Sequence, residues 1–281
     1  MEVSHSGYYA WLKRLTKPPC LKRKKLADLI KDCYWENRKR YGTRRIKAAL
    51  AKSGVKVGRL KIRKLMQEEG LKAMQPKSFQ PKTTDSKGTR ASPNLLAQVK
   101  IEECAAGKII VGDITYLPLR NGKFCYLAVW QDKVTRSIIG WSVAETMTAE
   151  LIISALKKAI MKGKVKAGAI IHSDRGSQYA ANEFRFLLRT NCFRQSMSGK
   201  GNCYDNAQAE SFFSRFKTEL LEGGVFEDVE QAKSEVFSYI EGYYNRVRLH
   251  SSLGYKSPME YEIELKTKNG GNRDSFVSTF S

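Results

Sequence analysis

Residues 108–132, KIIVGDITYLPLRNGKFCYLAVWQD, constrain the fold more than any other stretch of the chain. Two runs rich in β-branched and aromatic residues, 108–119 and 124–132, flank the dipeptide Asn121–Gly122, which favours a tight turn between antiparallel strands. The stretch therefore predicts a β-hairpin. Apolar residues surround Asp113 in the first run, where an ionised carboxylate is costly to bury unless it is paired, hydrogen-bonded or bound to a metal ion.

The segments after the hairpin follow the order of a ribonuclease-H-like sheet. The pattern predicts a strand over 137–143, a helix over 149–162, a strand over 167–174, a helix over 182–189, a strand over 193–197 and a last helix that contains Glu210. We therefore expect an α/β fold with a mixed five-stranded sheet flanked by helices. The order alone does not decide the function, because unrelated activities share folds.

A small, strongly basic region precedes this sheet. Helical patterns cover 22–36, 43–52 and 58–68, and the last pairs an apolar face with a basic one, which is typical of a helix-turn-helix module. Residues 1–82 carry 23 basic and 6 acidic side chains, most of the chain's net charge of +22. This charge favours DNA as the partner. A solvated lysine-rich hairpin without a partner is the alternative, and an anionic membrane or an acidic protein would also suit the charge.

Composition divides the chain into five parts. An N-terminal segment, 1–21, precedes the basic domain, 22–74. Residues 75–98 are rich in Pro, Ser, Thr and Lys without apolar periodicity, so we expect a flexible basic linker there. The α/β domain with C-terminal helices spans 99–266, and a flexible tail is expected over 267–281.

The sequence lacks the signals of export. No apolar run approaches the ~20 residues of a membrane span, and the N-terminus lacks the pattern of a signal peptide. We therefore expect no membrane partner and a cytoplasmic protein. Six scattered cysteines without a CxxC pair, and three histidines, predict neither a structural zinc site nor a disulfide framework.

Two further acids stand where they can join Asp113. Asp174 ends the predicted strand 167–174, at the edge where such sheets present ligand-binding groups, and Glu210 lies beside the phenylalanine face of its helix. Three carboxylates suit Mg²⁺ or Mn²⁺ rather than zinc. A pair of such ions supports in-line phosphoryl transfer.

Each acid also has an ordinary structural interpretation. In that interpretation Asp113 serves a bulge or a turn, Asp174 caps the following helix, and Glu210 is a solvent-facing acid of its helix. The joint placement of all three on strands and a helix favours the metal site over three separate structural roles.

Several longer motifs run in order over nearly the whole chain. They are RYGTRRIKAAL, IRKLMQEEGLKA, GDITYLPLRNGKFCYLAVWQDKVTRSIIGWSV, HSDRGSQY, SMSGKGNCYDNAQAESFFSRFKTEL and YNRVRLHSSLGYKSP. Together they resemble bacterial insertion-sequence transposases, namely the second-reading-frame proteins with a retroviral-integrase-type catalytic core. The resemblance implies that Asp113, Asp174 and Glu210 are the catalytic, metal-binding acids, and that each site holds two ions of Mg²⁺ or Mn²⁺.

The same resemblance implies a reaction and its partners. A DNA transposase of this kind cuts the ends of its element and attacks other DNA with the freed 3′-hydroxyls, which integrates and recombines DNA. Expected partners are double-stranded DNA, at terminal inverted repeats and target, and a second copy of the chain. The first-reading-frame protein would join as a partner or a frameshift fusion, at the bacterial nucleoid. A nuclease of the same fold and a regulator with an inert core are the alternatives.

The candidate DNA contacts come from both parts of the chain. Lys217 follows Glu210 by seven residues and matches a basic residue that family members place near DNA. The others are Arg175, Lys200, Asn206, Arg44, Arg45, Arg59, Lys61, Arg63, Lys64, Arg246 and Arg248. Packing and solvation explain Arg246 and Arg248 equally well. Two departures from the family pattern are a start close before SGYYAWLKR, which suggests an internal start, and Gly58 and Leu60 where relatives often have polar or basic residues.

Overall fold

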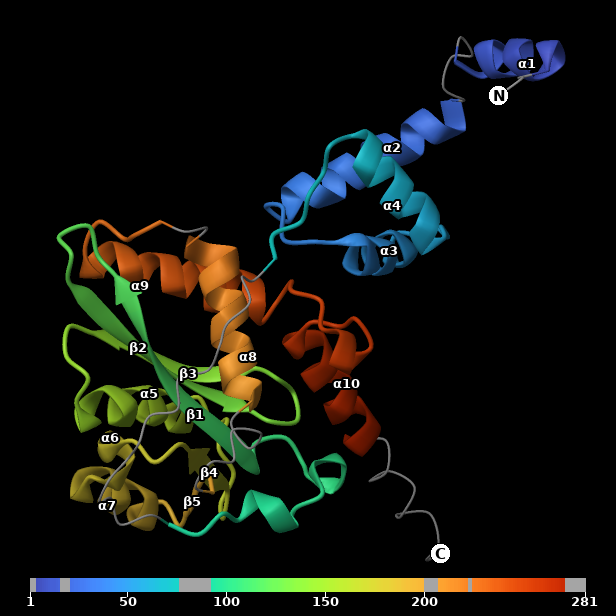
Figure 1. The fold of residues 1–281 in the computed structure, drawn as a ribbon. Helices are drawn as coiled ribbons and strands as arrows, with labels where there is room; N and C mark the ends of the chain where they lie inside the picture. Colours follow the sequence, from blue (N-terminus) through green and yellow to red (C-terminus); the bar gives the residue numbers. More distant parts are fainter. Residues whose placement is uncertain (1–3, 16–20, 76–91, 200–206, 222–223, 271–281) are drawn as a thin grey trace, which may run out of the picture. The chain divides into compact units, whose positions relative to one another are not determined.

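The computed structural model describes residues 4–15, 21–75, 92–199, 207–221 and 224–270. The chain forms two compact units, Met1–Gln75 and Pro76–Ser281, whose helices and strands are labelled in Figure 1. None of the helices in these ranges is long and apolar enough to cross a membrane.

The first unit is helical. Its helices are α1 (His5–Leu15), α2 (Leu21–Glu36), α3 (Thr43–Lys52) and α4 (Arg59–Glu68). The last three confirm the predicted helices, and they meet around the fully buried Ile30, Ile46 and Ile62. Ion pairs from Arg23 and Lys31 of α2 to the glutamates that end α4 join the two helices at their exposed edge.

The second unit is built on a mixed five-stranded sheet, as the sequence predicts, and its strands lie in the order β3-β2-β1-β4-β5. The strands are β1 (Ile109–Pro118), β2 (Phe124–Asp132), β3 (Ile138–Ala144), β4 (Ile170–Ser173) and β5 (Arg194–Met197). β1 pairs antiparallel with β2 through the predicted hairpin, where Gly122 has a φ of +77°. On its other side β1 pairs in parallel with β4, and β4 with β5.

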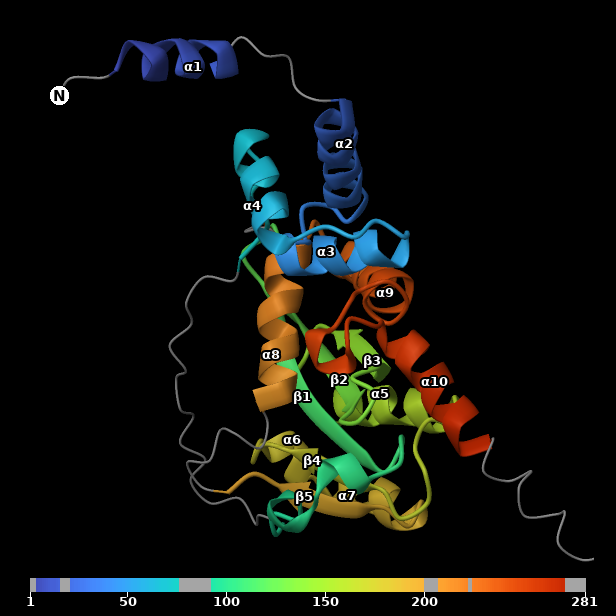
Figure 2. The same ribbon diagram turned by 90° about the vertical axis from the view of Figure 1, so that its right-hand side faces the viewer.

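Helices cover both faces of this sheet (Figures 1 and 2). One face packs on α5 (Ala149–Met161), α6 (Ser177–Ala180) and α7 (Asn182–Thr190), around a core that includes Trp130, Leu156 and Phe184. The other packs on α8 (Ala207–Phe216) and α9 (Val229–Phe237), around Leu127, Phe212 and other apolar residues. Short 3₁₀ turns lie at Leu96–Gln98, Ile101–Glu103 and Ser251–Leu253.

Two π-helical segments extend the helices of the second face. Lys217–Leu221 continues α8, and Ser238–Tyr244 continues α9. Between them Arg248 forms an ion pair of 2.9 Å with Glu219, and the Tyr239 hydroxyl donates a hydrogen bond to the same carboxylate. All three side chains are buried, so the pair ties the end of α8 to the C-terminal region.

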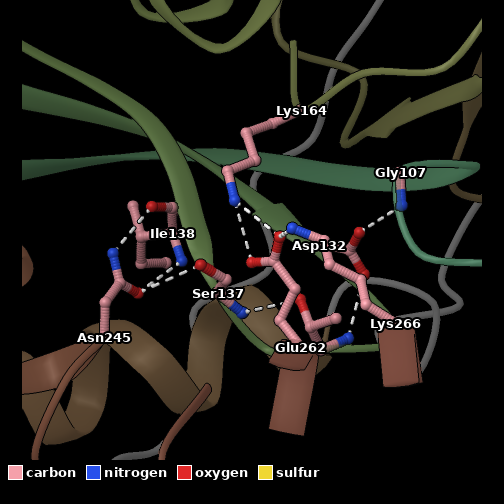
Figure 3. A network of polar contacts seen from close by, with 9 residues as sticks. Gly107, Asp132, Ser137, Ile138, Lys164, Asn245, Glu262 and Lys266 are labelled. Carbon is pink, nitrogen blue, oxygen red and sulfur yellow. Dashed lines mark hydrogen bonds and ion pairs between the residues drawn. The ribbon is translucent and has the colours of Figure 1, made fainter. Parts of the chain in front are cut away.

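The C-terminal region is attached to the end of the sheet where β2 finishes. Figure 3 shows Asn245 bonded to both backbone groups of Ile138, and Lys164 paired at 2.6 Å with Glu262 of α10 (Pro258–Gly270). Asp132 accepts hydrogen bonds from the backbone N–H groups of Gly107, Val134 and Thr135. These contacts fix the loops at this end of the sheet.

The boundaries of two predicted flexible segments differ from the structure. In residues 92–98, predicted to belong to the linker, Leu96 is buried against Ile109 and Ile170, and the Leu95 N–H donates to Ser196. The sheet edge therefore orders the end of that segment. Likewise α10 continues to Gly270, past the predicted start of the tail. Residues 76–91 and 271–281 lie outside the described ranges.

Candidate active site

The sheet brings Asp113 and Asp174 to the same level. β1 and β4 pair in parallel only from Ile109–Ile170 to Val111–His172. If the same register is continued for two more residues, Asp113 lies opposite Asp174. At this point β4 has ended and the two strands separate. Beyond this point β4 no longer pairs with β1, so the edge of β1 is open next to Asp113. This is the position at which α/β sheets commonly bind ligands.

The backbone beside Asp113 is packed from beneath. A Cβ atom on Gly112 would lie 2.3 Å from the Trp130 ring, so only glycine leaves room for that ring. The Trp130 indole donates a hydrogen bond to the Ile152 carbonyl, which holds the ring in the core. Asp113 is thereby carried on a rigid strand, and one of its oxygens accepts a hydrogen bond from the Ile114 N–H.

Asp174 is held by a short turn. Its Oδ1 accepts a hydrogen bond of 3.0 Å from the Gly176 N–H, immediately before α6. The preceding His172 is buried between the hydroxyls of Ser196 and Ser198. These contacts fix the strand end, while the Asp174 residue itself stays exposed.

Glu210 lies on α8, as the helical pattern predicts. Phe212, Phe213 and Phe216 of this helix are buried against the sheet, whereas Glu210 is exposed beside them. The helix therefore docks by its aromatic face and leaves its acid near the open edge of β1. The residues just before it, including the predicted DNA contacts Lys200 and Asn206, lie outside the described ranges.

The three acids influence one another electrostatically. Loss of hydration, followed by the charge of Asp174, raises the pKa of Asp113 to about 8, and Glu210 adds to the rise. Loss of hydration also raises the pKa of Glu210, again with a contribution from Asp174. The pKa of Asp174 is raised by its partial loss of hydration, against the hydrogen bond from Gly176. Like charges therefore share one site.

These side chains suit a divalent cation in kind but are not assembled around one. All three offer carboxylate oxygens, the ligands that Mg²⁺ prefers in proteins. Among the described residues, however, no three His, Cys, Asp or Glu side chains lie close enough to hold a metal ion. The acids are within electrostatic range of one another but do not share a common coordination point.

Lys217 and two aromatic rings border the acids. The Lys217 ammonium lies 3.9 Å from the centre of the Tyr116 ring, and Phe124 contacts that ring edge-on at 5.3 Å. Tyr116 is 56% exposed and Phe124 47% exposed, which is unusual for rings on a central hairpin. Loss of hydration lowers the pKa of Lys217, and the charge of Asp113 opposes that change. Alternation in the sequence suggests buried strand residues here, so the exposed rings were not predicted.

The other predicted DNA contacts fall into three groups. Arg44, Arg59, Lys61, Arg63 and Lys64 of the first unit are exposed, as is Arg246. Arg45 is partly buried and donates to the Arg40 carbonyl, and Arg175 is partly buried and donates to the Ser198 carbonyl. Arg248 is buried and paired with Glu219.

The burial of Arg248 contradicts its prediction as a phosphate contact. Only 4% of the residue is exposed, and its guanidinium is held by two oxygens of Glu219. The prediction was wrong because a basic residue in a polar C-terminal stretch carries no sign in the sequence of its distant acidic partner.

A cavity of the second unit lies apart from this site. It has a volume of about 610 Å³ and is lined by Gly107, Asp132, Lys166, Glu262 and neighbouring residues, at the end where β1 and β4 begin. Its acids are already satisfied, Asp132 by backbone N–H groups and Glu262 by lysines. Asp113 and Asp174 lie toward the opposite end of the parallel strands β1 and β4.

Comparison with known proteins adds independent information. Models described as integrase core domain match residues 104–203 and 210–265, and one described as HTH-like domain matches 22–79. The chain is 38% identical over 259 residues to the insertion element IS600 uncharacterized 31 kDa protein of Shigella sonnei, covering 92% of this chain and 94% of that protein. It is 39% identical over 243 residues to the transposase for insertion sequence element IS904 of Lactococcus lactis, covering 86% and 95%.

The comparison also found similar solved structures. One of them is the HTLV-2 integrase catalytic core domain in complex with magnesium, with a TM-score of 0.43 at 17% identity, over 56% of this chain and 97% of that one.

Proposed function

The chain belongs to the insertion-sequence transposases that carry an integrase core domain, and on that premise we propose that Asp113, Asp174 and Glu210 form its catalytic centre. The observation that supports this most is the register of β1 and β4, which sets the two aspartates level at an open strand edge. The chain is a DDE polynucleotidyl transferase. We propose that Asp113, Asp174 and Glu210 are the two aspartates and the glutamate to which the letters DDE refer.

The proposed centre binds divalent metal through these acids. Two ions of Mg²⁺ or Mn²⁺, when bound, would stabilise the attacking and leaving oxygens of an in-line displacement. The chain's own part is to hold three carboxylates, with Asp113 on β1, Asp174 directly after β4 and Glu210 on α8. Because the charges of these carboxylates oppose one another and no three acids of the described residues meet at one point, we propose that DNA and metal together complete the arrangement.

The basic residues would place DNA against this centre. Lys217 is proposed to contact a phosphate near the reacting bond, because its ammonium lies in the field of Asp113. Arg175 and Arg246 are proposed as further contacts on the second unit. On the first unit the exposed basic side chains of α3 and α4 supply the contacts that hold the end of the element.

The reaction implies a complex of more than one chain. Two element ends are cut and joined together, so at least two copies of the chain are proposed to act on DNA, at terminal inverted repeats and at the target. The first-reading-frame protein is proposed as a partner or as the N-terminal part of a frameshift fusion.

Strand transfer of a pre-cut element end into a plasmid tests the proposed function. The wild-type protein with Mg²⁺ is expected to produce joined molecules, and chelation of the metal is expected to abolish them. Hydrolysis of the DNA without any joined product would instead identify a nuclease. DNA binding with neither reaction, in the presence of the first-frame protein, would identify a regulator.

A further inference from the structure

The hydroxyl group of Tyr179 is buried and has no hydrogen-bond partner among the residues that the structure describes. Tyr179 lies on α6, and only 2% of the residue is exposed. In the described part of the chain its oxygen has no partner within hydrogen-bond distance. A buried polar group left unpaired costs about 1–3 kcal/mol. Phenylalanine would fill the same space without that cost, so packing alone does not explain the tyrosine.

The ring of Tyr179 is fixed by its neighbours. It packs edge-on against Trp130, at 6.0 Å between ring centres, and against Phe184, at 5.9 Å. Trp130 in turn lies directly against Gly112, the residue before Asp113. The aromatic group therefore lies under the strand that carries the first acid, and the ring has no freedom to turn its hydroxyl toward solvent.

The same ring lies beside the second acid. A methyl group placed on Gly176 would be 3.1 Å from Oδ1 of Asp174 and 3.4 Å from Cδ2 of Tyr179, so both side chains border one small space. Burial raises the pKa of the Tyr179 phenol well above its usual range, and the charges of Asp174 and Asp113 add to the rise. The hydroxyl therefore stays protonated, as a donor near two carboxylates.

We infer that Tyr179 is a positioning residue of the catalytic centre, whose hydroxyl donates a hydrogen bond to the Asp174 carboxylate when that carboxylate turns to hold a divalent ion. The inference rests on the proposed function of the three acids. Among the described residues Asp174 accepts its hydrogen bond from Gly176, and none pairs with the Tyr179 hydroxyl. Hydrogen bonds to metal-binding groups orient them, and loss of such a partner commonly weakens metal affinity or activity 10- to 100-fold.

Replacing Tyr179 by Phe in the full chain separates this role from packing. The variant keeps the ring contacts and loses only the unpaired hydroxyl, so the melting temperature of the metal-free protein is expected to stay the same or to rise. The Mg²⁺ concentration for half-maximal strand transfer is expected to increase about tenfold or more. The Mg²⁺ concentration needed to raise the melting temperature should increase in parallel, which is a readout independent of activity.

A matched control is Tyr244→Phe, because the Tyr244 hydroxyl accepts a hydrogen bond of 2.8 Å from Gln131. That variant is expected to melt at a lower temperature with its Mg²⁺ dependence unchanged. Unchanged Mg²⁺ dependence in Tyr179→Phe would overturn the inference, whether or not its stability changed. A wild-type protein that joins no DNA would instead count against the proposed function, while the effect of Mg²⁺ on melting would still test Tyr179.

Discussion

Burial of the ionised Asp113 carboxylate destabilises the folded state, and a bound metal ion would offset that effect. The folded chain raises its pKa to about 8, whereas an unfolded aspartate titrates near 3.9. Between these values the folded state binds the proton more tightly, so the stability of the metal-free protein falls as pH rises. Asp113→Asn removes this dependence. At pH 8 without metal the variant is expected to be more stable than wild type by roughly 3–5 kcal/mol, at about 1.4 kcal/mol for each unit of the pKa difference, and near pH 4 the two should converge.

Thermal melting at both pH values, with and without Mg²⁺, checks this prediction. Mg²⁺ is expected to stabilise the wild-type protein and to have little effect on Asp113→Asn, because a ligand stabilises only the state that binds it. Replacing the exposed Asp28 of α2 by Asn serves as the control for the removal of one carboxylate. A variant less stable than wild type at pH 8 would show that the Asp113 charge is already compensated in the metal-free fold.

The residues of the site differ in how far the sequence reveals them. Asp113 and Asp174 interrupt or end apolar strands, and that contrast is local, so it is visible in the sequence. Arg248 pairs with Glu219, and the Tyr179 ring packs on Trp130, both of which are distant in the chain. The buried ion pair of Arg248, and the missing partner of the Tyr179 hydroxyl, arise only when the helices pack. Local patterns contain neither.

The Arg248–Glu219 ion pair links the π-helical segment Lys217–Leu221 to the C-terminal region, and the sequence does not predict this contact. Arg248→Met would remove the charged partner of the buried Glu219 carboxylate, which also accepts a hydrogen bond from Tyr239. We expect a loss of about 3–5 kcal/mol in the free energy of unfolding, measured by urea denaturation. Arg246, two residues earlier and exposed, provides the matched control. Arg246→Met should leave stability unchanged and weaken DNA binding, whereas equal stability losses in both variants would contradict the buried pairing.

Element by element, the predicted strands and helices of the sheet match the structure because each carries a complete local signal. The helix Thr43–Lys52 and the strand Phe124–Asp132 have the predicted bounds, set by helical spacing and by the hairpin turn. The four-residue α6 and the π-helical Lys217–Leu221 were not predicted. A short helix has too few residues for a period, and a π-helical turn is stabilised by packing and not by composition.

At the scale of the whole molecule, most of the charge lies in the unit that matches the HTH-like domain. Replacing Arg59, Lys61, Arg63 and Lys64 by Ala is expected to weaken DNA binding and to flatten its salt dependence. The slope of log affinity against log salt should fall by about 0.9 for each phosphate that the variant no longer neutralises. Alanine at the exposed Lys100, Lys157, Lys266 and Lys268 of the other unit removes the same amount of charge and serves as the control. Equal slopes for the two variants would show that net charge, rather than this helix, binds DNA.

The central claim is that Asp113, Asp174 and Glu210 together catalyse DNA joining, and Glu210→Gln tests it most directly. The substitution keeps the size of a side chain that is exposed on α8, so folding and DNA affinity should be unaffected. Glu230→Gln, at an equally exposed position in the first turn of α9, is the control. In a strand-transfer assay with a pre-cut end and Mg²⁺, we predict that Glu210→Gln loses essentially all joining while Glu230→Gln joins at the wild-type rate. Wild-type joining by Glu210→Gln would contradict the account.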